Sequence, residues 1–126
     1  MSVVTQANIR IDQGAEFETT IIIEDENSDR VNLANYNIFA QIRKTYTSSK
    51  FWHFDIDMTY AEEGELKIRL PSARSIDIKP GRYMYDIYGE FILNNVEWPD
   101  EAAKIYKFVE GIADVVPRIT KIEENV

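Results

Sequence analysis

The sequence contains no cysteine and a single histidine, and these absences exclude several kinds of chemistry. Without cysteine there are no disulfides, no thiolate metal ligands and no cysteine nucleophile. The lack of disulfides also favours a protein made in a reducing cytosol. One histidine, His53, cannot form a histidine-rich metal site, and the Gly-x-Ser-x-Gly sequence of a hydrolase nucleophile is missing. We therefore expect no enzyme activity, no metal and no cofactor.

Basic residues and long apolar runs are also scarce. The chain has 14 Lys and Arg against 22 Asp and Glu, which gives a net charge of -8. Such a charge repels nucleic-acid phosphates and anionic membrane surfaces. No apolar run has the length needed to span a bilayer, and residues 1–8 lack the features of a signal peptide. We expect no nucleic-acid partner and no membrane association.

Alternation of apolar and polar side chains, the period of a β-strand, is the main pattern that is present. In residues 52–58 the apolar Trp52, Phe54, Ile56 and Met58 alternate with polar residues. Similar patterns predict strands at residues 8–13, 16–24, 31–33, 36–45, 65–70, 82–94 and 104–116. Residues 71–78 are too short for a full helix and predict a helical turn after Pro71.

These seven or eight short strands predict an all-β fold, an immunoglobulin-like antiparallel β-sandwich. We expect one domain over residues 1–126, with its core at about residues 8–119 and a polar C-terminal tail. Five residues are expected to be buried together: Trp52, Phe54, Ile56, Tyr85 and Ile87. Gly111, inside the last strand, indicates a bulge or a close approach of two backbones.

Three polar features can each be interpreted as a functional site or, more simply, as ordinary surface or turn residues. His53 is expected to face solvent, because no complete catalytic set accompanies it. The acidic segment Asp25–Asp29 offers calcium ligands, but it lacks the EF-hand spacing and is typical of a turn. Asp55 and Asp57 would be about 7 Å apart on one strand face, a separation that suits an inverting glycosidase. That face is expected to be solvated, which favours the simpler interpretation.

Four segments, in this order, resemble a known group of proteins: Ile9–Phe17, Ala40–Lys44, Lys79–Ile87 and Val109–Pro117. Together they are similar to small immunoglobulin-like virion structural proteins of tailed bacteriophages, found in tails, baseplates and necks. The resemblance covers Ile9 to Ile119 and implies a structural role with no catalytic residues. The connection from Leu93 to Lys104 is longer than in that group, which leaves a docking surface at this end unassigned.

Several aromatic residues are candidates for a protein interface. Phe39 and Tyr88 fall on faces that are expected to meet solvent, and Trp98 lies near the tip of the long connection. Tyr106 and Phe108 share one side of a strand that is apolar on both sides. Such a strand lies either in a thick core or against another chain. The simpler interpretation is core packing plus ordinary surface aromatics.

The sequence therefore predicts a non-enzymatic structural protein of a tailed-phage virion, made in the host cytoplasm. Its expected partners are other virion proteins and further copies of itself, and we expect the Trp98 end to contact another chain. Arg82, Lys104 and Lys107 could offset the repulsion between acidic subunits there. The alternatives are a capsid decoration protein or a carbohydrate-binding module, the latter with Trp98 and Tyr46 stacking on sugars.

Overall fold

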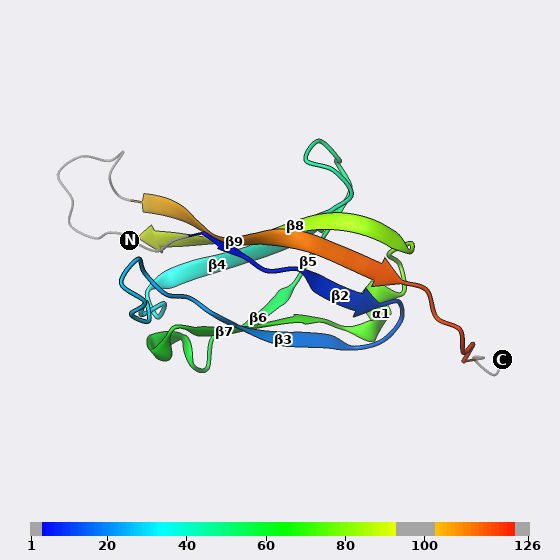
Figure 1. Cartoon of the computed structure of the whole chain (residues 1–126), viewed down its shortest axis with the longest axis horizontal. Coiled ribbons are helices and arrows are strands. Elements are labelled where there is room, and N and C mark those ends of the chain that lie inside the picture. The colour runs from blue at the N-terminus through cyan, green and yellow to red at the C-terminus, as the bar shows by residue number, and fades with distance from the viewer. Residues whose placement is uncertain (1–3, 93–102, 123–126) are drawn as a thin grey trace.

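The chain folds as a β-sandwich of two packed sheets (Figure 1). The computed structural model describes residues 4–92 and 103–122. The larger sheet contains β1 (Thr5–Gln6), β2 (Ile9–Asp12), β4 (Tyr36–Arg43), β5 (Phe51–His53), β8 (Gly81–Ile92) and β9 (Ala103–Val116). The smaller sheet contains β3 (Phe17–Ile22), β6 (Asp55–Asp57) and β7 (Glu65–Leu70). Two short helical turns complete the described elements, η1 (Ala61–Glu63) and α1 (Ser72–Ser75). The predicted all-β sandwich is confirmed.

The strand order is that of an immunoglobulin domain. The strands β9, β8, β4 and β5 follow one another in the larger sheet, and β3, β7 and β6 in the smaller one. These orders correspond to the G-F-C-C′ and B-E-D strands of immunoglobulin sandwiches. Near the start of β8, the Tyr83 hydroxyl donates a 2.6 Å hydrogen bond to the Lys79 carbonyl. This is the tyrosine corner of that fold, here in a domain without a disulfide.

The N-terminal edge of the larger sheet departs from the antiparallel pairing of the other strands. Both β1 and β2 pair with β9 in parallel, in the registers Thr5 with Val109 and Ile9 with Ala113. The chain leaves β2 through Gly14, whose φ of 78° suits a glycine, and continues into β3 of the other sheet. Because β2 is not joined to its neighbour by a hairpin, no turn forces the antiparallel direction.

Apolar residues from both sheets form one core. Fully buried side chains come from the inward positions of the strands, among them Ile11, Ile42, Leu66, Ile68, Leu70 and Ile87. The rings of Phe54 and Tyr85 meet edge to face with centroids 6.0 Å apart. The predicted burial of Phe54, Tyr85 and Ile87 is confirmed.

Trp52 and Ile56 are only partly buried, so the predicted five-residue cluster is wrong in part. The single strand expected at residues 52–58 divides at Phe54, because the chain passes there from one sheet to the other. Its first part, β5, pairs with β4, and its second part, β6, pairs with β7. Trp52 thus lies in a strand at the edge of the larger sheet, beside the Tyr83 ring.

A β-bulge in β9 explains why that strand is apolar on both sides. Ile87 pairs with Val109, but the next residue, Tyr88, pairs with Lys107, which leaves Phe108 as the extra residue. Phe108 and Val109 consequently both point into the core and are fully buried. The Phe108 ring fills the space next to Gly89, where an added Cβ would lie 2.2 Å from it.

Other predictions have mixed outcomes. Residues 31–33 form no strand: an isolated bridge joins Glu24 to Arg30, although Leu33 is fully buried. Gly111 does mark a close backbone approach, since an added Cβ would lie 2.1 Å from the Ala7 carbonyl oxygen. Among the described residues, no helix has the length and apolarity to cross a membrane.

Candidate functional site

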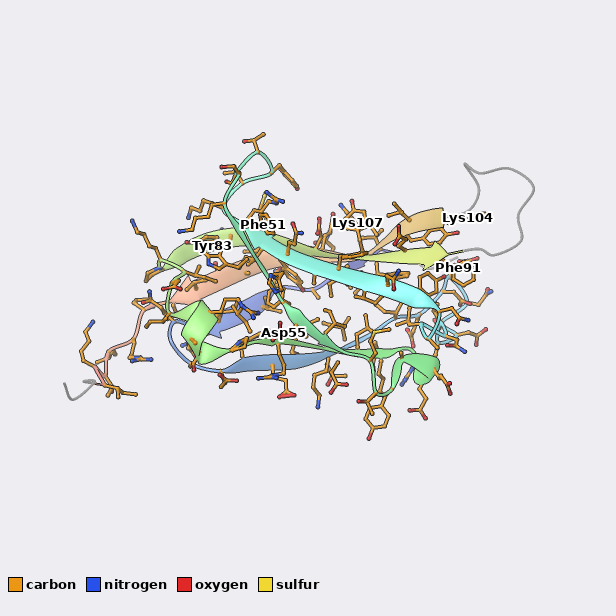
Figure 2. The ribbon with its side chains drawn as sticks, turned by 180° about the vertical axis from the view of Figure 1, so that it is seen from behind. Phe51, Asp55, Tyr83, Phe91, Lys104 and Lys107 are labelled. Carbon is orange, nitrogen blue, oxygen red and sulfur yellow. The ribbon has the colours of Figure 1, made fainter. Side chains whose placement is uncertain are left out.

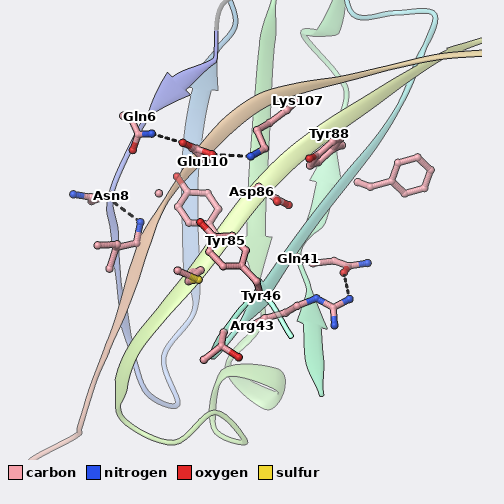
Figure 3. Close-up of a pocket in the computed structure, with 15 residues that line it drawn as sticks. Gln6, Asn8, Gln41, Arg43, Tyr46, Tyr85, Asp86, Tyr88, Lys107 and Glu110 are labelled. Carbon is pink, nitrogen blue, oxygen red and sulfur yellow. Dashed lines mark hydrogen bonds and ion pairs between the residues drawn. The ribbon is translucent and has the colours of Figure 1, made fainter. Parts of the chain in front are cut away.

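A shallow groove of about 660 Å³ crosses the outer face of the larger sheet, the face directed away from the smaller sheet (Figure 3). Its floor is built by side chains that alternate outward along β4, β8 and β9. The strand registers arrange these side chains in rows that run across the sheet. We call this feature the groove.

The first row is aromatic. Phe39 of β4 lies opposite Tyr88 of β8, and Tyr88 lies opposite Lys107 of β9. Phe39 is 53% exposed, which is unusual for a phenylalanine in the middle of a strand. The Lys107 ammonium lies 5.9 Å from the centre of the Tyr88 ring, within the range of a cation–π contact.

The second row places two carboxylates side by side. Asp86 of β8 lies directly opposite Glu110 of β9, an arrangement that is unfavourable for like charges. Glu110 accepts hydrogen bonds from Lys107 at 2.7 Å and from Gln6 at 2.5 Å. The bond from Lys107 is the main reason why the pKa of Glu110 is lowered and that of Lys107 is raised. Both hydrogen-bond partners of Glu110 are therefore residues of the groove itself.

Asp86 has no such partner. Within the described part of the chain, no hydrogen bond or ion pair reaches its carboxylate. Burial raises the pKa of Asp86, and the charge of Glu110 adds to this effect, while Lys107 and Arg43 oppose it. Figure 3 shows Asp86 on the floor between Tyr88 and Glu110. The groove thus holds an acidic group that a basic or hydrogen-donating ligand would stabilise.

The third row contains Arg43 of β4 and Met84 of β8, which lie opposite each other. The Arg43 guanidinium donates to the Gln41 side chain at 2.9 Å and to the Ser48 carbonyl at 2.6 Å. It also lies 4.4 Å from the centre of the Phe51 ring. These contacts direct Arg43 toward the loop after β4, so it forms no ion pair with Asp86.

The polar features suggested by the sequence lie outside the groove. The His53 side chain is 63% exposed, and its Nε2 is 4.0 Å from Asp55, whose carboxylate pairs with Arg74 at 3.1 Å. Asp57 accepts hydrogen bonds from both the amide and the hydroxyl of Thr59, and these bonds lower its pKa. Asp55 and Asp57 thus each have a partner of their own.

The acidic segment after β3 forms a turn. Asp25 accepts hydrogen bonds from the amides of Asn27 and Asp29, at 2.9 and 3.0 Å. These local bonds are those expected of an aspartate that begins a turn. In the described residues, no three His, Cys, Asp or Glu side chains are close enough to share a metal ion.

The groove contains two of the five candidate interface residues, Phe39 and Tyr88. Tyr106 is half-buried, with its ring 6.4 Å from that of Tyr36. The choice of Phe108 is wrong, because the bulge turns this side chain into the core. Trp98 lies outside the described residues. Alternation along β8 predicts that Asp86 points outward. It does not predict that the Asp86 carboxylate lacks a partner.

Comparisons with known proteins assign no family. No family model matches the chain, and no curated protein matches it. Among solved structures, the chain is similar to a family 123 glycoside hydrolase from Clostridium perfringens, studied for the hydrolysis of glycolipid glycans. The match has 16% identity and a TM-score of 0.40, and covers 90% of this chain and 23% of that one. The chain thus spans about a quarter of the length of that enzyme.

Proposed function

We propose that this chain is a non-enzymatic structural protein of a tailed-phage particle, a tail, baseplate or neck component, and that its groove contacts a neighbouring virion protein. The observation that carries the proposal is the exposed aromatic row of the groove, next to a carboxylate without a partner. This combination lies on a rigid three-strand floor rather than on a loop. The assignment to a phage particle is based on the sequence resemblance to virion proteins of tailed bacteriophages.

The aromatic row has the properties of an interface anchor. Aromatic residues contribute most of the binding energy in many protein interfaces, because they bury a large area at a low cost in side-chain entropy. Phe39 and Tyr88 lie side by side on neighbouring strands, so a partner could cover both rings in one contact. Met84, further along β8, extends the same surface with an adaptable side chain.

The partner is expected to present a basic side chain. An arginine that enters the groove would pair with Asp86 and could place its guanidinium on the Tyr88 ring. Such a pair would remove the repulsion between Asp86 and Glu110 and would hold the Asp86 carboxyl in its charged form. Neutral or acidic partner surfaces would leave this carboxylate buried and unpaired, at a cost of about 1–3 kcal/mol or more.

The test compares two outward apolar residues on opposite faces of the sandwich. Phe39 on the larger sheet is 53% exposed, and Ile22 on the smaller sheet is 41% exposed. Particles would be produced with the chain as Phe39→Asp or as Ile22→Asp, and the amount of the chain in purified particles would be measured. Equal thermal melts of the two isolated variants would show that both are folded.

We expect Phe39→Asp to reduce incorporation by at least about tenfold, because a charged side chain cannot fill an apolar interface. Ile22→Asp should be incorporated like the unaltered chain. Equal incorporation of both variants would refute the groove as the contact surface. Absence of the unaltered chain from the particles would refute the structural role itself.

A carbohydrate-binding module is the second candidate, and one observation favours it. Tyr46, which is 80% exposed, lines the groove together with Phe39 and the side-chain amides of Gln6 and Gln41. Exposed rings beside amide groups are suited to stacking on and hydrogen bonding to a sugar. Titration with a panel of oligosaccharides, followed by the intrinsic fluorescence of the chain, would separate the two candidates. Binding that is lost in Tyr46→Ala but retained in Asp86→Asn would favour the module.

A further inference from the structure

A second hollow, of about 260 Å³, lies at one end of the sandwich, where β4 ends and β8 begins. It is lined by three lysines, Lys44, Lys50 and Lys79, and by two aromatic residues, Trp52 and Tyr83. Ser48 and Asp77 complete the lining. Figure 2 shows Tyr83 and Phe51 at this end of the molecule, and Phe91 and Lys104 at the other. We call this hollow the lysine pocket.

Two of the three lysines cover the two rings of the pocket. The Lys44 ammonium lies 4.8 Å from the centre of the Tyr83 ring, and the Lys50 ammonium lies 5.0 Å from that of Trp52. The two rings meet edge to face, with centroids 6.1 Å apart. Cations therefore cover the rings that a sugar would need to stack on, and the pocket is suited to an anion instead.

The lysine pocket has an excess of positive charge, because its lining contains three lysines and one carboxylate, Asp77. No ion pair reaches Lys44, Lys50 or Lys79 within residues 4–92 and 103–122. The basic residues expected to offset repulsion between subunits are already engaged in part, because Arg82 pairs with Asp114 and Lys107 pairs with Glu110. In a chain of net charge -8, the lysine pocket is thus a local basic site.

The opposite end of the sandwich is acidic. The loop after β3 and the η1 turn lie together there, joined by a hydrogen bond from the Leu33 amide to the Ala61 carbonyl (Figure 1). We define the acidic end as the exposed side chains of Glu24, Asp29, Glu62 and Glu63. The nearby Arg30 donates to the Glu63 carbonyl and pairs with Glu65 at 3.4 Å, outside this set.

The length of β4 keeps the two ends apart. This strand begins beside the acidic loop and ends next to Lys44, and its eight residues span roughly 25 Å at the rise of a β-strand. This distance is more than twice the screening length at physiological salt. The two ends therefore do not neutralise each other within one molecule.

We propose that the lysine pocket of one copy binds the acidic end of a second copy, so that the chains associate head to tail. Two copies with a net charge of -8 repel in most orientations, and this arrangement brings opposite charges into contact. Each copy has one basic and one acidic end, so the contact is heterologous and continues into a row or closes into a ring. This contact does not involve the groove and goes beyond the function proposed above.

The first experiment measures self-association of the isolated chain by sedimentation velocity, up to a concentration of about 1 mM. At about 150 mM sodium chloride, where repulsion between the net charges is screened over the length of the molecule, the sedimentation coefficient should increase with protein concentration. At about 500 mM, salt also screens the contact, and the concentration needed for half association should increase at least tenfold. A chain that stays monomeric over the whole concentration range at about 150 mM would overturn the proposal.

A charge exchange identifies the surfaces. The double variant Lys44→Glu/Lys50→Glu should stay monomeric, and so should Glu62→Lys/Glu63→Lys. An equimolar mixture should associate again, because each variant retains the end that the other has lost. Two monomeric variants that do not associate when mixed would contradict a head-to-tail contact, and so would unchanged association of either variant alone.

Two controls separate this contact from net charge and from the groove. Lys67→Glu/Arg69→Glu alters the smaller sheet with the same change in net charge as the lysine variant, and it should associate normally. Phe39→Asp, which tests the groove, should also associate normally. Loss of association in the Lys67 and Arg69 variant would attribute the effect to net charge and overturn the proposal. Loss in Phe39→Asp alone would assign self-association to the groove instead.

Discussion

The outer faces of the two sheets differ in how their charges and apolar groups are arranged. On the smaller sheet, Lys67 pairs with Glu18 at 3.2 Å, and Arg69 pairs with Glu16 at 3.2 Å. These cross-strand pairs neutralise a face that water can solvate. The larger sheet has an exposed Phe39 and an unpaired Asp86 at equivalent outward positions. This difference is the reason why we propose the outer face of the larger sheet, and not that of the smaller one, as the surface for a partner.

The two sheets also differ in regularity. The smaller sheet keeps strict alternation, since β3 and β7 pair without interruption from Phe17 to Ile22. The larger sheet contains the bulge at Phe108 and the close approach of Gly111 to the N-terminal strand. The bulge places the Phe108 ring in the core, while Lys107 and Glu110 of the same strand line the groove. The predictions below test this division, in order of decreasing effect.

Phe108→Ala should produce the largest loss of stability. Its ring is fully buried next to Gly89, so truncation leaves a cavity and should lower the free energy of unfolding by about 3–5 kcal/mol. Urea denaturation of both proteins measures this loss. A decrease below about 1 kcal/mol would mean that Phe108 faces solvent and that β9 has no bulge.

Tyr85 should make stability sensitive to alkaline pH. Burial raises the pKa of the Tyr85 hydroxyl to about 12, from 10.0. Because the folded protein holds this proton more tightly than the unfolded chain, its contribution is fully present below pH 10. It is lost as the pH rises toward 12, and amounts to about 2–3 kcal/mol. Unfolding of Tyr85→Phe should show a correspondingly shallower decline over this range, and parallel declines would contradict the buried hydroxyl.

Gly111→Ala should destabilise the chain by about 1–3 kcal/mol. The added Cβ would lie 2.1 Å from the Ala7 carbonyl oxygen, which also accepts the hydrogen bond from Tyr85. Either β1 must move away from β9 or the backbone must distort. Glu110→Ala, one residue earlier, provides the control and should leave the melting temperature nearly unchanged, because exposed ion pairs contribute little to stability. Equal melting temperatures for the two variants would show that the parallel N-terminal edge is not closely packed.

Much of the fold could be predicted from alternation, because a one-sided sheet imposes a period of two on its residues. The pattern in residues 16–24 and 65–70 predicts two of the three strands of the smaller sheet, β3 and β7. The bulge could not be predicted, since an extra residue is defined by the partner strand and not by the sequence of β9. The division of the strand at Phe54 could not be predicted either, because the alternation of residues 52–58 continues unchanged where the chain passes from one sheet to the other.

The candidate site could be predicted only in part. Alternation predicts that Phe39 and Asp86 point outward. Whether they form a site depends on their cross-strand neighbours, such as Tyr88 and Glu110. Whether a carboxylate has a partner depends on registers that no single strand encodes. The lysine pocket illustrates this most clearly, since its residues come from two separate parts of the chain: β5 with the loop before it, and β8 with the turn before it.

Phe39→Ala and Lys67→Ala should have the smallest effects on stability, each within about 0.5 kcal/mol. Both residues lie on outer faces, where little packing is lost. The two variants should differ in assembly, however, because only Phe39 belongs to the expected contact surface. Thermal melts together with incorporation into particles would compare them. A large loss of stability in Phe39→Ala would indicate that this ring supports the fold rather than a partner.

The central claim is that the outer face of the larger sheet contacts another virion protein. Hydroxyl-radical footprinting of the isolated chain and of assembled particles tests it most directly, because the method reports the solvent exposure of individual side chains. The account predicts that modification of Phe39 and Tyr88 decreases several-fold on assembly, while Ile22 on the smaller sheet is modified at an unchanged rate. Equal modification of Phe39 in both states, or protection of Ile22 alone, would contradict it.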